Sequence, residues 1–109
     1  MTSIFRCFTV FGTFCLVCSY SANAQSDAAK TFKANCAMCH AANGSGDTAP
    51  GKALKAKDLR SAEVQKHTDA ALTEIISKGK GKMPAFAATI QPDDMKKIVA
   101  YVRGLAKQK

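Results

Sequence analysis

Apolar residues recur at steps of three and four positions in three stretches of the chain, which is the spacing of one helical face. The three sets are Ala28, Phe32, Cys36 and Cys39; then Leu72, Ile75 and Ile76; then Met95, Ile98, Val99, Val102 and Leu105. They predict helices over about 28–40, 69–78 and from 92 onward. No stretch shows the alternation typical of a half-buried strand. The pattern therefore predicts an all-α domain.

Residues with strong preferences at helix ends indicate where these helices begin and end. Ser26 or Asp27 is expected to cap the first helix, because its side-chain oxygen can accept from a free N–H of the first turn. Gly79 is expected to end the second helix, and Pro92 fits the first position of the last one. The stretch 41–51, with three glycines and a proline, is predicted to be a loop.

The N-terminal part of the chain differs in composition from the rest. Arg6 is the only charged residue before Asp27, the stretch after it is first apolar and then small and polar, and residues 22–24 have the A-x-A form of a cleavage site. This order is typical of a secretory signal peptide. We therefore expect residues 1–24 to be a cleaved signal peptide. Residues 25–109 would form one mature domain, exported to the periplasm or another extracytoplasmic compartment.

The alternative is a retained N-terminal anchor. A membrane-spanning helix needs about 20 mostly apolar residues, whereas the strongly apolar part ends near Val17 or Cys18. Cleavage is therefore the expectation, with no stable membrane insertion afterwards. The C-x-x-C pair of Cys15 and Cys18, like Cys7, is interpreted as small apolar residues that leave with the signal peptide.

Cys36, Cys39 and His40 remain in the mature domain and have the spacing C-x-x-C-H. This spacing is the attachment signature of c-type haem: the two thiols add to the two vinyl groups of the porphyrin, and the histidine gives a nitrogen to the iron. A zinc site would need four ligands, and only His67 is left over. A thioredoxin-like disulfide catalyst would need a strand before the pair, and no strand pattern precedes it. The motif therefore predicts one covalently bound haem c per chain.

Met83 is the candidate for the second axial ligand of the iron. It lies in the segment GKGKMPAF, residues 79–86, where the glycines permit a close approach and the proline stiffens the backbone. A lone methionine is more often core filler than ligand, and Met38 and Met95 are interpreted in that way. His67 stands between polar neighbours and is expected at the surface, although it is the alternative ligand.

Three segments together make the chain similar to the small bacterial monohaem c-type cytochromes of class I: CAMCH at 36–40, GKGKMPAF at 79–86 and IVAYVRGL at 98–105. The resemblance covers residues 27–106. It implies an all-α fold of three to five short helices wrapped around one covalently bound haem, with the first and last helices crossing. It also implies single-electron transfer between redox partners, with no enzymatic reaction.

The resemblance also implies roles for residues outside the two motifs. Phe32, four residues before the first haem cysteine, takes the aromatic position at the helix crossing, with Ala28 beside it and Tyr101 opposite. Pro50 is the only proline between the two ligand candidates. Its carbonyl group is therefore expected to accept the proton on the second nitrogen of His40, which would orient the ring.

The mature domain is basic. The chain has 16 Lys and Arg against 8 Asp and Glu, so the loss of Arg6 leaves a net charge of +7. Lysines occur in all the segments that are expected near the haem: Lys30, Lys33, Lys52, Lys55, Lys57, Lys78, Lys80 and Lys82. Those that flank the two motifs are expected to steer a protein partner with an acidic docking surface, although lysines also serve solubility alone. A nucleic-acid partner is not expected of an exported protein.

These observations favour an extracytoplasmic single-electron carrier that works as a monomer. Two alternatives stay open. One is a cytochrome subunit of a larger oxidoreductase, such as a dehydrogenase or oxidase. The other, less favoured, is a five-coordinate haem enzyme or gas-binding protein. In each case an apolar wall around the haem is expected from Leu54, Leu59, Leu72, Ile76 and Phe86.

Overall fold

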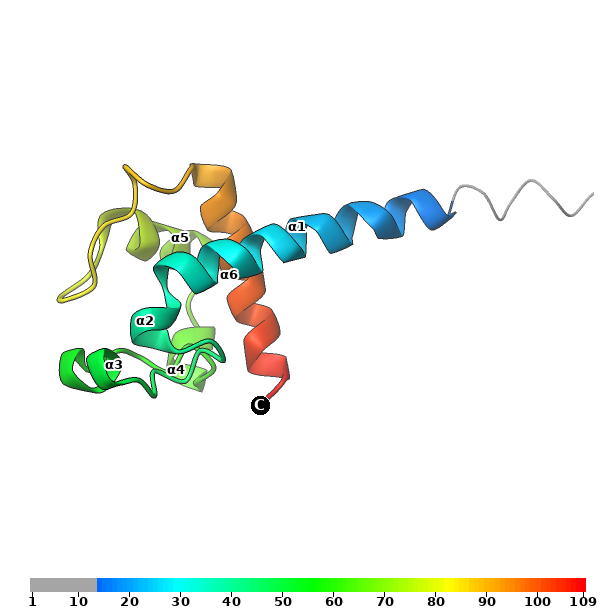
Figure 1. Cartoon of the computed structure of the whole chain (residues 1–109). Coiled ribbons are helices and arrows are strands. Elements are labelled where there is room, and N and C mark those ends of the chain that lie inside the picture. Colours follow the sequence, from blue (N-terminus) through cyan, green and yellow to red (C-terminus); the bar gives the residue numbers. More distant parts are fainter. Residues whose placement is uncertain (1–13) are drawn as a thin grey trace, which may run out of the picture.

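The structure is a computed structural model that describes residues 14–109. In this range the chain forms six helices (Figure 1): α1 Phe14–Asn35, α2 Ala37–His40, α3 Ala49–Leu54, α4 Ala62–Gln65, α5 Asp69–Lys78 and α6 Pro92–Lys107. The extended pairing within this range is limited to an isolated bridge between Lys80 and Met83. The predicted all-α fold is confirmed.

Helix α1 already includes the positions at which the first helix was expected to begin. It runs without a break through residues 26 and 27, so neither Ser26 nor Asp27 is an N-cap. The Ser26 Oγ donates instead to the carbonyl oxygen of Asn23, 2.8 Å away. The predicted cap was wrong because the small and apolar residues before position 26 continue the helix.

The predicted signal peptide is only partly within the described range. Residues 1–13 lie outside it, and the predicted cleavage point after Ala24 falls inside α1. Among the residues that the structure describes, no helix combines the length and the apolar character needed to cross a membrane.

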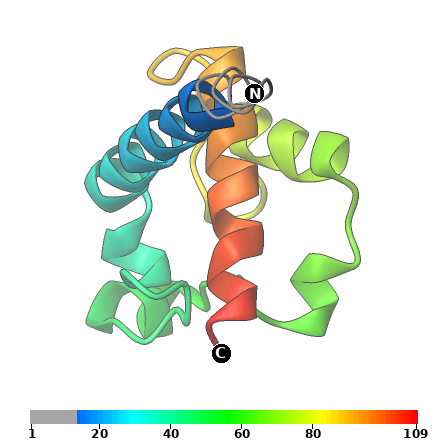
Figure 2. The ribbon, with the colours of Figure 1, turned by 90° about the vertical axis from the view of Figure 1, so that its right-hand side faces the viewer.

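Helices α1 and α6 cross, and the core of the domain lies between them (Figure 2). Phe32 on α1 and Ile98 on α6 are each 1 % exposed, and Ala28 is also buried. The rings of Phe32 and Tyr101 lie 5.2 Å apart between centroids, at an interplanar angle of 52°. Aromatic pairs prefer such a tilted arrangement. The predicted crossing of the first and last helices at Phe32 is therefore confirmed.

Helix α5 packs against α6 but contributes no fully buried residue. Its large apolar residues Leu72, Ile75 and Ile76 are all half-buried. Helices α2 and α3 likewise bury no apolar side chain. This part of the domain therefore has apolar surface that the described chain does not cover. Such surface costs free energy in water unless another group covers it.

The helix ends are fixed by hydroxyl side chains and by two of the predicted residues. Thr48, Ser61 and Thr68 are the N-caps of α3, α4 and α5, and each hydroxyl accepts from the N–H three residues further on. Gly79, with φ of +74°, follows the last residue of α5, and Pro92 is the first residue of α6. Both predictions are confirmed. They determine where α5 ends and the glycine-rich segment starts.

Candidate haem-binding site

The two cysteines of the C-x-x-C-H motif lie at the junction of α1 and α2. Cys36 is the N-cap of α2 and Cys39 lies within this helix. Both are half-buried and have free thiols. Burial, and to a smaller extent the neighbouring Cys39, raises the pKa of the Cys36 thiol to about 11. The first cysteine of a disulfide catalyst has a lowered pKa instead, so this pair does not match that chemistry.

The side chain of His40, the last residue of α2, is anchored by a backbone carbonyl group. The Nδ1 atom of His40 lies 2.9 Å from the carbonyl oxygen of Lys57. Because a carbonyl oxygen can only accept, Nδ1 carries the proton, and the neutral ring then has its lone pair on Nε2. Nε2 is therefore the nitrogen available to a metal. The anchoring bond also orients the ring and makes it a stronger ligand.

The partner of His40 is a correction to the sequence analysis, which assigned this role to Pro50. Pro50 lies exposed in the first turn of α3, and the acceptor beside the imidazole is the carbonyl of Lys57. The chain passes through α3 and reverses at Lys55, a residue with φ of +55°, before it returns to His40. The position of Pro50 in the loop after the C-x-x-C-H motif therefore did not predict which carbonyl group lies beside His40.

Close packing between α2 and α3 holds this anchor in place. The Oγ1 of Thr48 donates to the carbonyl oxygen of Met38 at 2.7 Å and accepts from the N–H of Gly51 at 2.9 Å. One side chain thus joins the two helices. A Cβ atom at Gly51 would lie only 2.1 Å from the carbonyl oxygen of Cys39. Any other residue at this position would push α3 away from α2.

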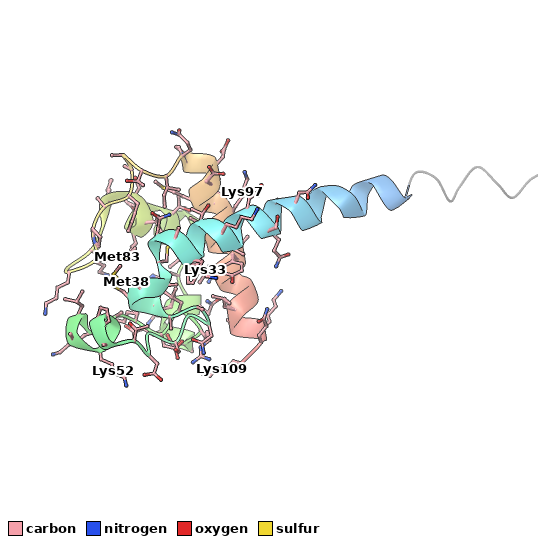
Figure 3. The ribbon with its side chains drawn as sticks, viewed as in Figure 1. Lys33, Met38, Lys52, Met83, Lys97 and Lys109 are labelled. Carbon is pink, nitrogen blue, oxygen red and sulfur yellow. The ribbon has the colours of Figure 1, made fainter. Side chains whose placement is uncertain are left out.

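Met83 lies at the end of a tight turn that follows α5 (Figures 1 and 3). Lys80 and Met83 exchange two backbone hydrogen bonds of 3.1 and 3.0 Å. Beyond the turn, the N–H of Phe86 donates to the carbonyl oxygen of Ile76 in α5 at 3.0 Å. A Cβ atom at Gly79 would lie 2.6 Å from the carbonyl oxygen of Met83. The backbone on both sides of Met83 is thereby fixed against α5.

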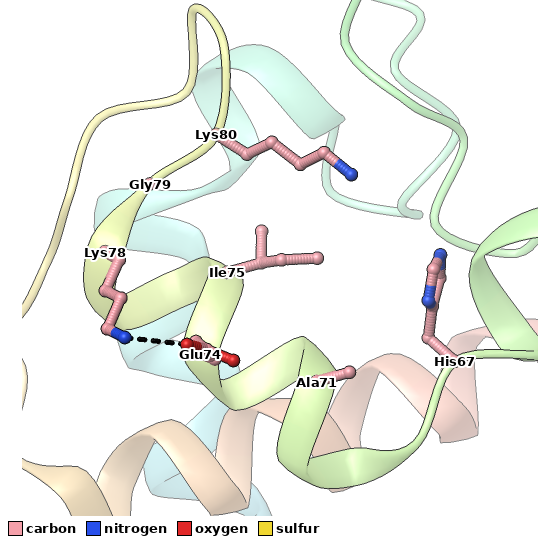
Figure 4. A pocket seen from close by; sticks show the side chains of 7 residues that line it. All are labelled: His67, Ala71, Glu74, Ile75, Lys78, Gly79 and Lys80. Carbon is pink, nitrogen blue, oxygen red and sulfur yellow. Dashed lines mark hydrogen bonds and ion pairs between the residues drawn. The ribbon is translucent and has the colours of Figure 1, made fainter.

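A cavity of about 360 Å³ lies beside this segment and α5. It is lined by His67, Ala71, Glu74, Ile75, Lys78, Gly79 and Lys80 (Figure 4). The side chain of Ile75 extends into it. The cavity connects the uncovered apolar face of α5 with the segment that carries Met83. The lining combines the apolar side chains of Ala71 and Ile75 with four ionisable side chains, those of His67, Glu74, Lys78 and Lys80.

The residues predicted as an apolar wall differ in their surroundings. Leu59, Ile76 and Phe86 are partly buried against the core. Leu72 is half-buried, whereas Leu54 is 43 % exposed. All five keep some surface that the described protein residues do not cover.

Met38 is a second correction. It was predicted to fill the core, as Met95 does, but it is 73 % exposed, whereas Met95 is buried. Cys36 and Cys39 are three positions apart and share one face of the helical turn, so the residue two positions after Cys36 points elsewhere. Apolar character alone was therefore not enough to place it.

His67 was expected at the surface, and the structure leaves it partly exposed. It is half-buried and lines the cavity, with its ring directed into it (Figure 4). Its carbonyl oxygen accepts from the Nη2 of Arg103 at 2.5 Å.

Arg103, on α6, was missed by sequence reasoning. It also donates to the carbonyl oxygen of Gln65 at 2.8 Å and to Oδ1 of Asp69 at 2.9 Å. These partners span the segment between α4 and α5, which one side chain thus fixes to α6. They lie 34 to 38 positions away in sequence, so no local pattern indicates them.

The lysines considered as a docking surface are all exposed (Lys33 and Lys52 are labelled in Figure 3). Three of the eight are paired with carboxylates: Lys52 with Asp47 at 2.8 Å, Lys57 with Glu63 at 3.0 Å and Lys78 with Glu74 at 2.7 Å. Within residues 14–109 the remaining five, Lys30, Lys33, Lys55, Lys80 and Lys82, form no ion pair.

Comparison with known proteins identifies the family. The sequence model of the family described as "Cytochrome C oxidase, cbb3-type, subunit III" matches residues 23–102. The chain belongs to this family, within the small monohaem c-type cytochromes of class I. Among solved structures, the KustC0563 c-type cytochrome superposes on this class I cytochrome with a TM-score of 0.66 and 31 % sequence identity. The match covers 72 % of this chain and 95 % of that one.

Curated relatives of this class I cytochrome include several cytochromes c6. Cytochrome c6 of Nostoc sp. (strain PCC 7120 / SAG 25.82 / UTEX 2576) is 37 % identical over 78 residues, which are 72 % of this chain and 68 % of that protein. Cytochrome c6 of Pyropia yezoensis is 37 % identical over 97 residues, which are 87 % of this chain and 86 % of that protein.

As a class I c-type cytochrome, the protein carries covalently bound haem c and is an electron-transfer protein with redox protein partners, not an enzyme. The residues present fit this cofactor on three observations. Two thiols lie three positions apart at the start of α2, the adjacent His40 presents its Nε2, and the half-buried apolar residues of α5 leave surface that the described chain does not cover.

Proposed function

We propose that this cytochrome is a single-electron carrier outside the cytoplasm, in which Cys36 and Cys39 form the thioether bonds to haem c. His40 and Met83 are then the axial ligands of the iron. The observation that carries the proposal is the contact of 2.9 Å between Nδ1 of His40 and the carbonyl oxygen of Lys57. Haem c supplies an iron that gains or loses one electron. The protein chain attaches the haem and supplies the two ligands of its iron.

The contact to Lys57 supports His40 as a ligand in two ways. It selects the tautomer whose Nε2 has a free lone pair, and it prevents rotation of the ring. The hydrogen-bonded Nδ1–H also increases the electron density that the imidazole can donate. Because His40 directly follows Cys39, the same helical turn that holds the covalent bonds also presents the ligand.

The fixed backbone around Met83 supports this residue as the sixth ligand. Its thioether sulfur is a soft ligand that favours reduced iron, so ligation by histidine and methionine raises the reduction potential. With His40 and Met83 both bound to the iron, no coordination position would be left for a substrate or a gas. This is the arrangement that an electron carrier needs, and it argues against a five-coordinate haem enzyme.

The location outside the cytoplasm rests on the N-terminal sequence. Residues 1–24 have the charge and apolar pattern of a signal peptide, with an A-x-A site before Gln25. We propose cleavage there, which gives a mature domain of residues 25–109.

Partner docking rests on charge. We propose that a monomeric, free carrier meets partners whose docking surface is acidic, through the exposed lysines Lys30, Lys33, Lys78, Lys80 and Lys82. Among them Lys78 contributes least, because Glu74 already pairs with it.

The decisive test is the mass of the exported protein, produced from the full chain in a bacterium with a haem-attachment system. We expect the mass of residues 25–109 plus one haem, and a low-spin optical spectrum. Cys36→Ser and Cys39→Ser should each leave a single thioether bond. Cys15→Ser is the matched control and should leave attachment complete, because this cysteine belongs to the signal peptide. His40→Ala should abolish the low-spin spectrum.

A mature protein without the added haem mass would refute the proposed attachment, and attachment at another residue would refute the assignment. Native mass measurement of the protein from its own source distinguishes the free monomer from a subunit of a larger oxidoreductase.

A further inference from the structure

Two basic side chains line the cavity beside α5, and the proposed function does not use them. His67 comes from the segment before α5, and Lys80 comes from the turn after it. Figure 4 shows the imidazole and the ammonium group directed into the same space, which the side chain of Ile75 also enters. Residues 13 positions apart in the sequence thus place two hydrogen-bond donors in the lining of one cavity, together with the apolar side chain of Ile75.

The charges on the cavity wall do not cancel. Glu74 and Lys78 also line the cavity, but they pair with each other at 2.7 Å. Across residues 14–109, the Nζ of Lys80 has no carboxylate within ion-pair distance, and the ring of His67 makes no hydrogen bond. The cavity wall therefore has one unbalanced positive charge and donor groups without acceptors.

Both basic residues are attached to fixed backbone. The carbonyl oxygen of His67 accepts from Arg103 at 2.5 Å, and Arg103 also binds Asp69, two residues further on. The backbone of Lys80 pairs with that of Met83 through two hydrogen bonds. The backbone positions of the two donors are thus fixed by protein contacts that need no ligand. A fixed backbone reduces the conformational freedom that the two side chains lose when they bind an anion.

We propose that His67 and Lys80 bind a propionate carboxylate of the haem. This inference rests on the proposed attachment at Cys36 and Cys39, which brings the cofactor to this domain. Haem carries two propionates, and a carboxylate that is taken out of bulk water against the protein is costly unless charged or polar donors satisfy it. Lys80 supplies the opposite charge and His67 a ring N–H.

The contact would also influence the iron. An unpaired carboxylate near the haem stabilises the oxidised, more positive iron and lowers the reduction potential. A carboxylate held by Lys80 and His67 has its charge partly neutralised, so this pair should keep the potential higher. Loss of either residue should therefore lower it.

The experiment uses the exported holoprotein and two variants, Lys80→Gln and His67→Ala. Each has a neighbouring control that does not line the cavity: Lys82→Gln on the same turn and Lys66→Ala before His67. Intact mass and the optical spectrum first establish attachment and axial ligation in each protein. Resonance Raman spectroscopy then measures the propionate bending mode, which responds to hydrogen bonding at the carboxylate, and potentiometry measures the reduction potential.

We expect Lys80→Gln and His67→Ala to keep a low-spin spectrum, to shift the propionate mode, and to lower the potential further than their controls do. An unchanged propionate mode in both variants would overturn the inference while leaving the haem attachment intact. Equal shifts in Lys82→Gln would also overturn it, because the effect would then be general charge removal. A high-spin spectrum in His67→Ala would make His67 an axial ligand and refute both this inference and the ligation by Met83. Wild-type protein without haem would refute the proposed function itself.

Discussion

At the scale of single residues, the function depends on which lone pairs the protein leaves available. The carbonyl oxygen of Lys57 fixes the proton of His40 on Nδ1, so the lone pair is on Nε2. The thioether of Met83 has no proton to place, so the proposed ligation by Met83 depends on the position of its side chain alone. That position follows from backbone bonds, since Lys80 and Phe86 tie the segment to itself and to α5. The two ligand candidates are therefore oriented by different means.

Replacement of Met83 tests this second orientation. We expect Met83→Ala to leave the iron with one protein ligand, so that the reduced protein binds carbon monoxide and the reduction potential falls. Optical titration with carbon monoxide and potentiometry measure both effects. Met38→Ala is the matched control, because Met38 is 73 % exposed, and it should retain the wild-type spectrum. If the ferric spectrum of Met83→Ala equals that of the wild type, Met83 is not the ligand.

Residues whose role depends on local spacing could be predicted from the sequence, and residues whose role depends on the path of the chain could not. Phe32 was placed correctly because it keeps a fixed distance from the motif on one helix. The acceptor for His40 was assigned to Pro50, although the chain reaches His40 only at Lys57, after α3 has reversed its direction. Met38 was misplaced because apolar character does not say which face of a short helix it occupies.

At the scale of elements, the packing of α2 on α3 determines whether the carbonyl oxygen of Lys57 lies close enough to His40 to accept its hydrogen bond. Gly51 is the point of closest approach, since a Cβ atom there would meet the carbonyl oxygens of Cys39 at 2.1 Å and Gly46 at 2.5 Å. Backbone atoms cannot move aside as the end of a flexible side chain can. A larger residue must therefore separate the two helices.

We expect Gly51→Ala to lower the free energy of unfolding of the holoprotein by about 1–3 kcal/mol, the usual cost of overpacking. Denaturant titration followed by the haem absorption band measures it. Gly104→Ala is the matched control in α6, where the nearest heavy atom to the added Cβ is 3.9 Å away. It should raise the free energy of unfolding by about 0.5–1 kcal/mol, because alanine suits a helix better than glycine. Equal effects of the two substitutions would contradict the close approach of α2 and α3.

The segment between α4 and α5 depends on Arg103 of α6. In Arg103→Ala the carbonyl oxygens of Gln65 and His67 lose their donor, so we expect the free energy of unfolding to fall by about 1–3 kcal/mol. Arg60→Ala is the control, because among the described residues the guanidinium of Arg60 pairs with Asp58 alone, two positions away, and such a local pair contributes about 1 kcal/mol or less. A smaller loss in Arg103→Ala than in Arg60→Ala would show that this segment is held by other contacts.

Among the elements, the end of α5 and the start of α6 could be predicted. Gly79 follows the last residue of α5, and Pro92 is the first residue of α6. The upstream part of α1 could not, since small residues such as those at 21–24 are compatible with both a helix and a cleavage region. The hydrogen bonds between Arg103 and the segment before α5 could not be predicted from the sequence either. It joins positions whose proximity results from the docking of α5 on α6.

At the scale of the whole molecule, the domain has two unequal parts. The crossing of α1 and α6 forms a core of fully buried side chains, whereas the part made by α2, α3 and α5 has half-buried apolar residues and a cavity. A small domain buries too little of its own surface to be robust, so a large cofactor that covers this second part adds to the core. Covalent attachment keeps the cofactor there. Exposed lysines lie next to this part in the chain, such as Lys33 in the last turn of α1, just before α2, and Lys82 in the turn after α5.

The distribution of these lysines predicts how the protein meets its partners. Electrostatic steering speeds the encounter of oppositely charged surfaces, and salt weakens it because the screening length is about 10 Å at 0.1 M. We expect Lys33→Glu with Lys82→Glu to slow electron transfer to an acidic redox protein at low ionic strength, and the difference from the wild type to vanish as salt increases. Stopped-flow measurement of haem oxidation over a range of salt concentrations gives these rates.

The control must change the net charge equally while leaving the site untouched. Lys97→Glu with Lys107→Glu meets this condition, because both lysines lie exposed on α6, and Lys97 lies away from Met83 in Figure 3. If steering is local, this control retains a rate closer to that of the wild type than the first pair does. If both double variants slow equally, net charge alone governs the encounter and no docking surface is defined. A rate that does not depend on salt in the wild type would leave the lysines with solubility as their role, since charge away from zero keeps a small protein dispersed.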